Sequence, residues 1–340
     1  MGLLDGKTVL ISGVRDEDSI AFAVAQVAQQ QGARVVLTAP ARAMPLAVAA
    51  ASALPEPGVP VIELDVTNSA ELAGLAVALR ERGINSLDGV VHSIAFAHKT
   101  LMGNSIFNND DDATTIHISP DTSKTVIAGS TRNLDAGAAP SSSVIAGSAR
   151  NLCADQPADQ RAAPTVIPAR GASGDTARNL TAARAAGYEQ QFERAATAFR
   201  TSAYSYHALV QAVLPLLNPG ASVVGMSFDA RFAWPNYNWM GVNKAALEAL
   251  NRYMARDLAP AGVRANIVSA GTVATGAALG IPGFKEKMTD GAAKAPLHWD
   301  PFNALPVAKA TVALLSDWFE MTTGDIIFVD GGAHAVHTWD

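Results

Sequence analysis

The sequence predicts an α/β fold: a single Rossmann-like, doubly wound domain with a seven-stranded parallel sheet, interrupted by an insertion. Short apolar runs rich in β-branched residues alternate with longer segments of helical periodicity. About seven such runs occur, the number expected for one doubly wound sheet. This alternation implies right-handed crossovers and a sheet that is buried on both faces.

The first part of the chain, residues 1–107, contains four predicted strands and three predicted helices. Each helix lies between two strands, as a parallel arrangement requires. In chain order we expect a strand at 7–12 (KTVLIS), a helix at 19–32, a strand at 34–38 (RVVLT), a helix at 41–53, a strand at 61–66 (VIELDV), a helix at 68–82 and a strand at 87–95 (LDGVVHSIA).

The last part, residues 188–340, resumes the same alternation. Pro219 and Gly220 are expected to end its first, long helix. The predicted elements are a helix at 188–217, a strand at 221–226 (ASVVGM), a helix at 237–259, a strand at 263–271 (VRANIVSAG), a helix at 304–317 and a strand at 324–332 (GDIIFVDGG).

The middle segment, 108–187, differs in composition, because it contains no Phe, Tyr or Trp. It carries a repeat, TVIAGSTRNL (125–134) and SVIAGSARNL (143–152), with a broken copy at 165–180. The copies are too short to act as solenoid units. This composition predicts a disordered insertion, because too little apolar surface is available to offset chain entropy. The alternative is an interaction module in which VIAGS pairs as a short strand.

Composition narrows the classes of function. The 340 residues are 49% hydrophobic and carry a formal net charge of −6, which argues against a general binder of nucleic acid or of anionic membranes. The single Cys153 cannot form an intrachain disulfide, and neither cysteine nor histidine spacing indicates a metal site. With no signal peptide or membrane-spanning run, we expect a cytoplasmic protein.

The turn after the first strand, SGVRDEDSIAFA (12–23), is where a dinucleotide-binding sheet holds phosphates. Gly13 permits a tight turn, and Ser19 is both a good helix N-cap and a candidate phosphate donor. The usual glycine-rich pattern is missing, so a helix merely capped by Ser19 explains this stretch equally well.

Three more turns follow strand ends, where ligands bind in open α/β sheets. Asp65 could accept a hydrogen bond from an adenine amino group, or could instead serve the start of the next helix at Asn68. HSIA (92–95) has small residues that allow close backbone approach to a ribose. In AGTVAT (270–275), Thr275 could bond a pyrophosphate and Val273 could contact a nicotinamide.

Tyr237 and Lys244 begin and end the stretch YNWMGVNK. A step of seven residues brings them to one helix face about 10 Å apart along the axis, with Met240 between them. Two such groups could hold different parts of one extended ligand. A helix with one buried aromatic and one solvated lysine is the simpler alternative.

The pattern Y-x-x-M-x-x-x-K resembles the enoyl-acyl-carrier-protein reductases, a divergent subgroup of the short-chain dehydrogenases and reductases, in particular the mycobacterial members. The resemblance covers 1–107 and 188–340. Its landmarks, in chain order, are GLLDGK (2–7), SIAF (19–22), AQVAQQQGA (25–33), IELDV (62–66), LDGVVHSIAF (87–96), SAYSY (202–206), VVGMSFD (223–229), YNWM (237–240), ALLSDW (313–318), TTGDII (322–327) and DGGAH (330–334).

The resemblance implies NADH as cofactor, an enoyl chain on acyl carrier protein as substrate, and a homotetramer. By motif, Tyr237 would hold the thioester carbonyl and stabilise an enolate, Lys244 would hold the nicotinamide ribose, and Phe228 would pack between nicotinamide and acyl chain. Met240 joins Tyr237 and Phe228 as substrate-binding. The positions implied to bind the cofactor are Gly13, Ser19, Ile20, Asp65, Val66, Ser93, Ile94, Ala95, Met226, Lys244, Gly271, Val273 and Thr275.

One feature of the strand before Phe228 favours reduction of C=C over C=O. A carbonyl-reducing enzyme of this fold would need a serine near Val224 or Gly225, and none stands there. Two alternatives stay open: a short-chain dehydrogenase acting on another enone or carbonyl, and a catalytically silent NAD-binding protein. The substrate loop, about 272–300, looks short for the family, which predicts a preference for shorter acyl chains. Arg42 leaves NADPH possible.

Overall fold

The computed structural model describes residues 1–103, 106, 174–281, 283–284, 288 and 292–336. Its centre is a seven-stranded, all-parallel sheet in the order β3-β2-β1-β4-β5-β6-β7, which confirms the predicted fold class. The strands are β1 (Thr8–Ser12), β2 (Arg34–Ala39), β3 (Val61–Glu63), β4 (Leu87–His92), β5 (Leu217–Ser227), β6 (Arg264–Ala270) and β7 (Ile326–Val329).

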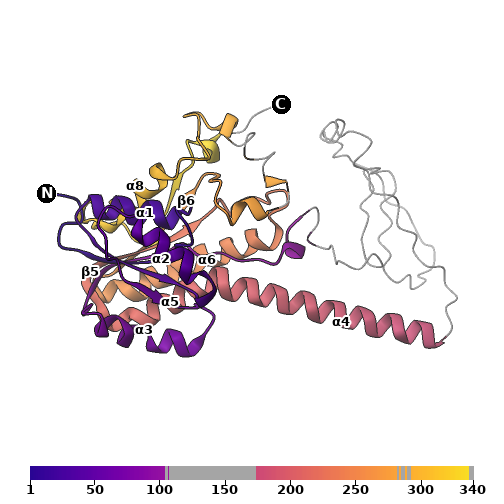
Figure 1. The fold of residues 1–340 in the computed structure, drawn as a ribbon. Coiled ribbons are helices and arrows are strands. Elements are labelled where there is room, and N and C mark those ends of the chain that lie inside the picture. Colours follow the sequence, from indigo (N-terminus) through magenta and orange to yellow (C-terminus); the bar gives the residue numbers. More distant parts are fainter. Residues whose placement is uncertain (104–105, 107–173, 282, 285–287, 289–291, 337–340) are drawn as a thin grey trace.

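Helices cover both faces of the sheet (Figure 1). Helices α1, α2 and α8 share one apolar cluster, and α3, α5 and α6 share the other. Alternate residues of one strand serve opposite clusters: Val9 and Ile11 belong to the first, and Leu10 to the second. The helices are α1 (Ile20–Gln30), α2 (Met44–Ser52), α3 (Ser69–Glu81), α4 (Gly174–Phe199), α5 (Ser205–Val213), α6 (Asn238–Leu258) and α8 (Leu305–Leu315).

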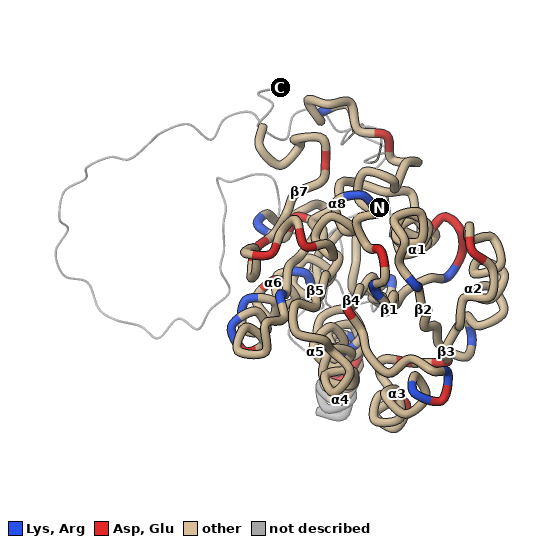
Figure 2. Tube along the Cα trace, turned by 90° about the vertical axis from the view of Figure 1, so that its left-hand side faces the viewer, with Lys and Arg blue, Asp and Glu red and all other residues tan. Residues whose placement is uncertain are grey.

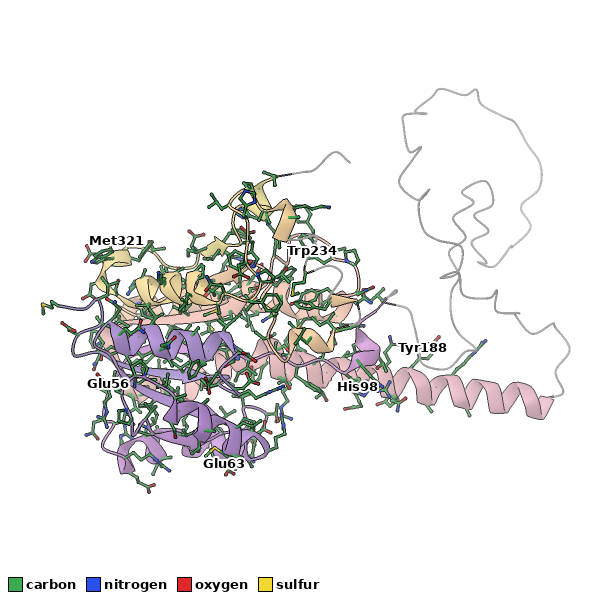
Figure 3. The ribbon with its side chains drawn as sticks, turned by 45° about the horizontal axis from the view of Figure 1, so that its top comes forward. Glu56, Glu63, His98, Tyr188, Trp234 and Met321 are labelled. Atoms are coloured by element: carbon green, nitrogen blue, oxygen red, sulfur yellow. The ribbon has the colours of Figure 1, made fainter. Side chains whose placement is uncertain are left out.

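The strand order reverses between β1 and β4, because β2 lies on one side of β1 and β4 on the other. A dinucleotide binds outside the carboxyl ends of the strands at such a switch point. His98 follows β4 and Trp234 follows β5, so both mark this end of the body (Figure 3). Glu56 and Met321 precede β3 and β7 and lie at the opposite end.

The long helix expected at 188–217 is three elements. Helix α4 begins at Gly174, a π-helical turn follows at Arg200–Tyr204, and α5 ends at Val213. Residues 174–187, which we expected to lack regular structure, are therefore helical. Their alanine content gives the physical reason, since Ala has the highest intrinsic helix propensity. Strand β5 also begins earlier than expected, at Leu217, and includes Pro219 and Gly220.

Most of the predicted insertion, including all three repeat copies up to residue 173, lies outside the described residues. Both the disordered reading and the strand-pairing reading of VIAGS therefore stay predictions. In the part of the chain that is described, none of the helices combines the length and the apolar character needed to cross a bilayer. Lys and Arg are interspersed with Asp and Glu around the described body (Figure 2).

Candidate active site

The turn after β1 is held against the end of β4. Gly13 has a φ of +106°, a conformation that side chains with a Cβ rarely adopt. A Cβ there would lie 2.1 Å from the carbonyl oxygen of Ser93. The Ser93 N–H donates to the Ser12 carbonyl at 3.0 Å, which fixes the two turns side by side. Only glycine fits at this position, which we call the Gly13 cradle: a turn whose surface is formed by the backbone of Gly13 and Ser93.

Ser19 caps the helix that points at the cradle. Its hydroxyl accepts from the Phe22 N–H at 3.2 Å and donates to the Asp16 carbonyl at 2.7 Å. Because the hydroxyl proton of Ser19 and the Phe22 N–H are both used, the groups that could face an anion here are the N–H groups that precede Phe22 in α1.

Arg15 is a residue that the sequence analysis missed. Its guanidinium pairs with Asp16 at 3.0 Å and reaches the loop after β6, where a Cβ on Gly276 would lie 2.6 Å from Nη2. The carboxyl ends of β1 and β6 are separated by β4 and β5, so this side chain spans the crevice. A cation in a phosphate-binding turn was the signal that could have found it.

Asp65 and Val66 lie beyond the end of β3, at the far side of β2 from the cradle. Asp65 accepts from the Thr67 N–H at 2.9 Å and from its hydroxyl at 2.7 Å. Partial burial opposes its ionisation, but the Thr67 hydrogen bonds and the charge of Arg42 outweigh burial and lower the pKa of Asp65. Asn68, not Asp65, caps α3 through its contacts to two backbone N–H groups.

The turn after β4 is secured by hydroxyls of the π-helical turn and α5. The Ser202 hydroxyl hydrogen-bonds both backbone groups of Phe96: it accepts from the N–H at 2.8 Å and donates to the carbonyl at 2.7 Å. This contact holds the preceding Ser93, Ile94 and Ala95 at the crevice. Ser202 lies in the landmark SAYSY (202–206), and its role becomes visible only through this contact.

His92 ends β4 beneath that turn. Its Nε2 lies 2.7 Å from the Ser205 hydroxyl, which also donates to the Thr201 carbonyl at 2.6 Å. With that hydroxyl proton used, His92 must donate from Nε2. Burial, helped by the charge of Lys244, lowers the pKa of His92 to about 3, so the ring stays neutral at physiological pH.

The loop after β6 is shaped by Trp299. A Cβ at Gly271 would lie 2.7 Å from Cε2 of this indole, whose Nε1 donates to the Thr272 carbonyl at 2.7 Å. Val273 is buried there, and the Thr275 hydroxyl accepts from the Ala278 N–H at 3.1 Å. The tryptophan thus sets the backbone path of the predicted nicotinamide and pyrophosphate contacts.

Tyr237 stands at the head of α6, between two residues with positive φ, Asn236 (65°) and Asn238 (36°). The Asn238 side chain donates to the Gly103 carbonyl at 2.8 Å, and Gly103 pairs with Asn236 in an isolated antiparallel bridge. The segment that leads into the predicted insertion therefore braces the backbone on both sides of Tyr237.

Lys244 lies deeper on the same helix, only 6% exposed. Its Nζ donates to the Met226 carbonyl at the end of β5, at 2.7 Å, and Met240 is buried one turn before it. The lysine is therefore not the solvated side chain of the simpler sequence interpretation. Burial lowers the pKa of Lys244 to about 8, against the opposing effect of Glu248.

Aromatic side chains surround the head of α6. The rings of Phe228 and Tyr237 meet edge to face at 5.3 Å, and Trp234 packs against Phe228 at 5.5 Å. The indole of Trp234 donates to the Asp229 carbonyl at 2.6 Å, and Asp229 pairs with Arg231 at 2.8 Å. Burial, and then the charge of Glu248, raise the pKa of Tyr237 above its usual range, so the phenol stays a donor.

The predicted residues thus fall into three groups. The ends of β1, β4 and β6 carry most of the cofactor positions, the end of β3 carries Asp65 and Val66, and the β5–α6 junction carries Phe228, Tyr237, Met240 and Lys244. Among the described residues, no group of three or more His, Cys, Asp or Glu side chains could hold a metal ion.

Comparison with known proteins identifies a family of similar sequences. A family model described as Enoyl-(Acyl carrier protein) reductase matches residues 13–149 and 177–334, and the gap between them falls in the predicted insertion. The chain is 34% identical to the enoyl-[acyl-carrier-protein] reductase [NADH] of Mycolicibacterium smegmatis and 35% to that of Mycobacterium avium, each over 98% of this chain and 97% of the relative. It is 29% identical to the reductase of Aquifex aeolicus, over 98% of this chain and 93% of that one.

Proposed function

The chain belongs to the enoyl-(acyl carrier protein) reductase family, and from that membership we propose that it reduces the trans-2 double bond of enoyl thioesters with NADH. The substrate would be an enoyl chain carried on acyl carrier protein, in type II fatty-acid or mycolic-acid-type synthesis. The observation that carries the proposal is the β5–α6 junction, where Tyr237 stands against Phe228 and over a buried Lys244.

The residues of β5 support reduction of C=C rather than C=O. A Cβ on Gly225 would lie 2.7 Å from Cδ1 of Ile267 and 3.2 Å from the Tyr206 ring, so a serine there would have to displace the Ile267 side chain. The nearby serines are committed elsewhere: Ser222 donates to the Leu314 carbonyl and Ser227 to Glu248. The second donor that a carbonyl-reducing site needs beside its tyrosine is therefore missing from this strand.

The described residues fit a dinucleotide. A side chain at position 13 would collide with backbone, so a ligand can approach bare backbone at Gly13, and α1 begins at the end of the same turn, capped by Ser19. The guanidinium of Arg15 can neutralise phosphate charge above it. Gly13, Ser19, Ile20, Ser93, Ile94, Ala95, Gly271, Val273 and Thr275 would hold NADH, with Asp65 and Val66 at the adenine end. When bound, NADH supplies the hydride.

Tyr237 would donate its phenolic hydrogen bond to the thioester carbonyl of the substrate. Because the raised pKa keeps this proton on the phenol, the hydrogen bond persists while negative charge develops on the carbonyl oxygen. The ring of Phe228 limits where the acyl chain can lie beside it. Met240 adds apolar surface on the same helix face.

Lys244 would bind the nicotinamide ribose. An ammonium group has three N–H donors, and Met226 takes one, so two are left for ribose hydroxyls. The positive charge also favours the developing enolate at a distance. The lysine therefore needs its proton for both tasks.

We further propose that the protein acts in the cytoplasm as a homotetramer. The other two functions weighed at the sequence level predict different outcomes in one assay. A reductase acting on other enones or carbonyls would turn over those substrates faster, and a catalytically silent protein would bind NADH without consuming it.

The decisive experiment measures NADH oxidation with trans-2-enoyl thioesters of increasing length, with a 3-ketoacyl thioester for comparison. We expect turnover of the enoyl series alone, with NADPH a poorer reductant, and a preference for shorter chains. Faster turnover of the ketoacyl substrate, or NADH binding without turnover of either, would refute the proposal.

A further inference from the structure

Two charged side chains of α6 hold consecutive residues at the end of β5. Lys244 donates to the carbonyl of Met226, and Glu248, one helical turn later, accepts from the hydroxyl of Ser227 at 2.7 Å. All of these side chains are buried, Glu248 with 7% exposure and Ser227 with 5%. A longer contact from the same hydroxyl to the Phe228 carbonyl, at 3.1 Å, competes for the Ser227 proton.

These two hydrogen bonds hold Met226 and Ser227, the residues directly before the proposed active-site residue Phe228. Phe228 follows Ser227 directly, and its ring is the one that meets Tyr237 at 5.3 Å. A shift of the β5 end would therefore move the surface against which the tyrosine and an acyl chain rest. Restraint on both Met226 and Ser227 leaves Phe228 little freedom of position.

A buried carboxylate is costly unless charges and hydrogen bonds compensate it. Burial leaves the pKa of Glu248 raised overall, with a further rise from the charge of Asp229, although the Ser227 hydrogen bond and the charges of Lys244 and Arg252 act to lower it. The charge of Glu248 acts in turn on Lys244, Tyr237 and Arg231. Of these, Lys244 is the cation that shares its buried helix face, one turn away.

We propose that Glu248 is a positioning residue of the reductase: it holds the end of β5 through Ser227 and places a carboxylate one helical turn from Lys244, on the same buried face of α6. The inference rests on the proposed function, since it assigns Glu248 a task in the site of Tyr237 and Lys244. The two parts of the task can be separated by substitution, because one depends on charge and the other on a hydrogen bond.

Glu248→Gln removes the charge and keeps the shape and a hydrogen-bonding partner for Ser227. Without the carboxylate, the protonated form of Lys244 loses a stabilising neighbour, so its pKa falls. At an effective dielectric constant of about 20, we expect the alkaline pH at which NADH affinity and kcat/KM fall to be lower by about one unit than in wild type. Ser227→Ala keeps the charge, so it should lower kcat about tenfold without shifting that pH.

The experiment records NADH binding and enoyl-thioester turnover from pH 6 to about 10 for wild type, Glu248→Gln and Ser227→Ala. Glu81→Gln removes a charge from an exposed site on α3 and serves as the matched control. The inference is overturned if NADH affinity and kcat/KM of Glu248→Gln fall at the same alkaline pH as those of wild type. It is also overturned if Ser227→Ala shifts that pH as much as Glu248→Gln does. Failure of wild type to turn over enoyl thioesters would instead refute the proposed function, and the pH dependence of NADH binding would still test Glu248. Thermal unfolding checks that each variant folds.

Discussion

Burial acts in opposite directions on the two residues of the YxxMxxxK pattern. It makes Lys244 easier to deprotonate and Tyr237 harder, because the neutral form of each is favoured away from water. At neutral pH the lysine is still charged, with a pKa of about 8, and the tyrosine keeps its proton. Both residues are therefore in the state that the proposed reduction needs.

Tyr237→Phe should lower kcat by about 10²–10³-fold, because one hydrogen bond to the developing oxyanion is lost. The Kd for NADH should stay the same, since Lys244 and the glycine cradle are untouched. Stopped-flow turnover and NADH fluorescence titration measure the two quantities separately. An unchanged kcat would mean that another group stabilises the enolate.

The pH dependence of wild-type activity follows from Lys244. Its lowered pKa means that the charged form is present below about pH 8 and is lost as pH rises through that value. We expect kcat/KM to be flat near neutrality and to fall above about pH 8. Lys244→Arg keeps a charge that does not titrate in this range, so its profile should lack the fall, whatever its absolute rate. A fall at the same pH in that variant would assign the titration to a different group.

At the scale of elements, the Gly13 cradle joins the first strand–helix turn to the end of β4. Gly13→Ala combines positive φ with a Cβ 2.1 Å from a backbone oxygen, which cannot move aside as a side chain could. We expect it to weaken NADH binding severely and to lower the melting temperature. Gly74→Ala is the matched control: it lies in α3 with open space around it and should stabilise the protein by about 0.5–1 kcal/mol. Normal NADH binding by Gly13→Ala would place the cofactor elsewhere.

The Arg15 side chain reaches from the turn after β1 to Gly276 in the loop after β6, and this contact can be tested separately. Gly276→Ala should push the Arg15 guanidinium out of its place, because the new Cβ would lie 2.6 Å from Nη2. Both Gly276→Ala and Arg15→Gln should raise the Kd for NADH several-fold and reduce its dependence on salt, because a cation–phosphate contact is lost. The double variant should be no worse than Arg15→Gln. Fully additive effects on Kd would show that the two residues act independently.

Elements with a local signature could be predicted from sequence, and contacts between distant segments could not. Apolar runs such as VVLT and the N-cap at Ser19 predicted β2 and α1 to within a few residues. Nothing local predicts that Ser202 clasps the backbone of Phe96 or that Glu248 receives Ser227, because those pairs meet only after the sheet has formed. The start of α4 is hard to predict for another reason: the lack of aromatic residues favours disorder there, while the alanine content favours a helix.

At the scale of the whole molecule, the parts of the chain before and after the predicted insertion form one sheet. Strand β4 pairs with β5 although the predicted insertion separates them in sequence. The flanks of that insertion also meet, because Arg194 donates to the Thr100 hydroxyl at 3.0 Å. The flank before it contacts the start of α6 as well, where Asn238 donates to the Gly103 carbonyl. Every residue assigned to the site comes from 1–103 or from 188–336.

A variant in which a short flexible linker replaces residues 108–187 should therefore keep the NADH-dependent turnover of the full-length protein. The free-energy change should be small, because the entropy of loop closure varies only with the logarithm of loop length. The same deletion carrying Tyr237→Phe is the control that ties any remaining rate to this site. Gly103, just before the removed segment, contacts the residues on both sides of Tyr237, so kcat would respond first if that segment affected catalysis. A large change in kcat with an unchanged melting temperature would mean that the insertion acts on the active site, and equal rates would mean that the family's chemistry is independent of it.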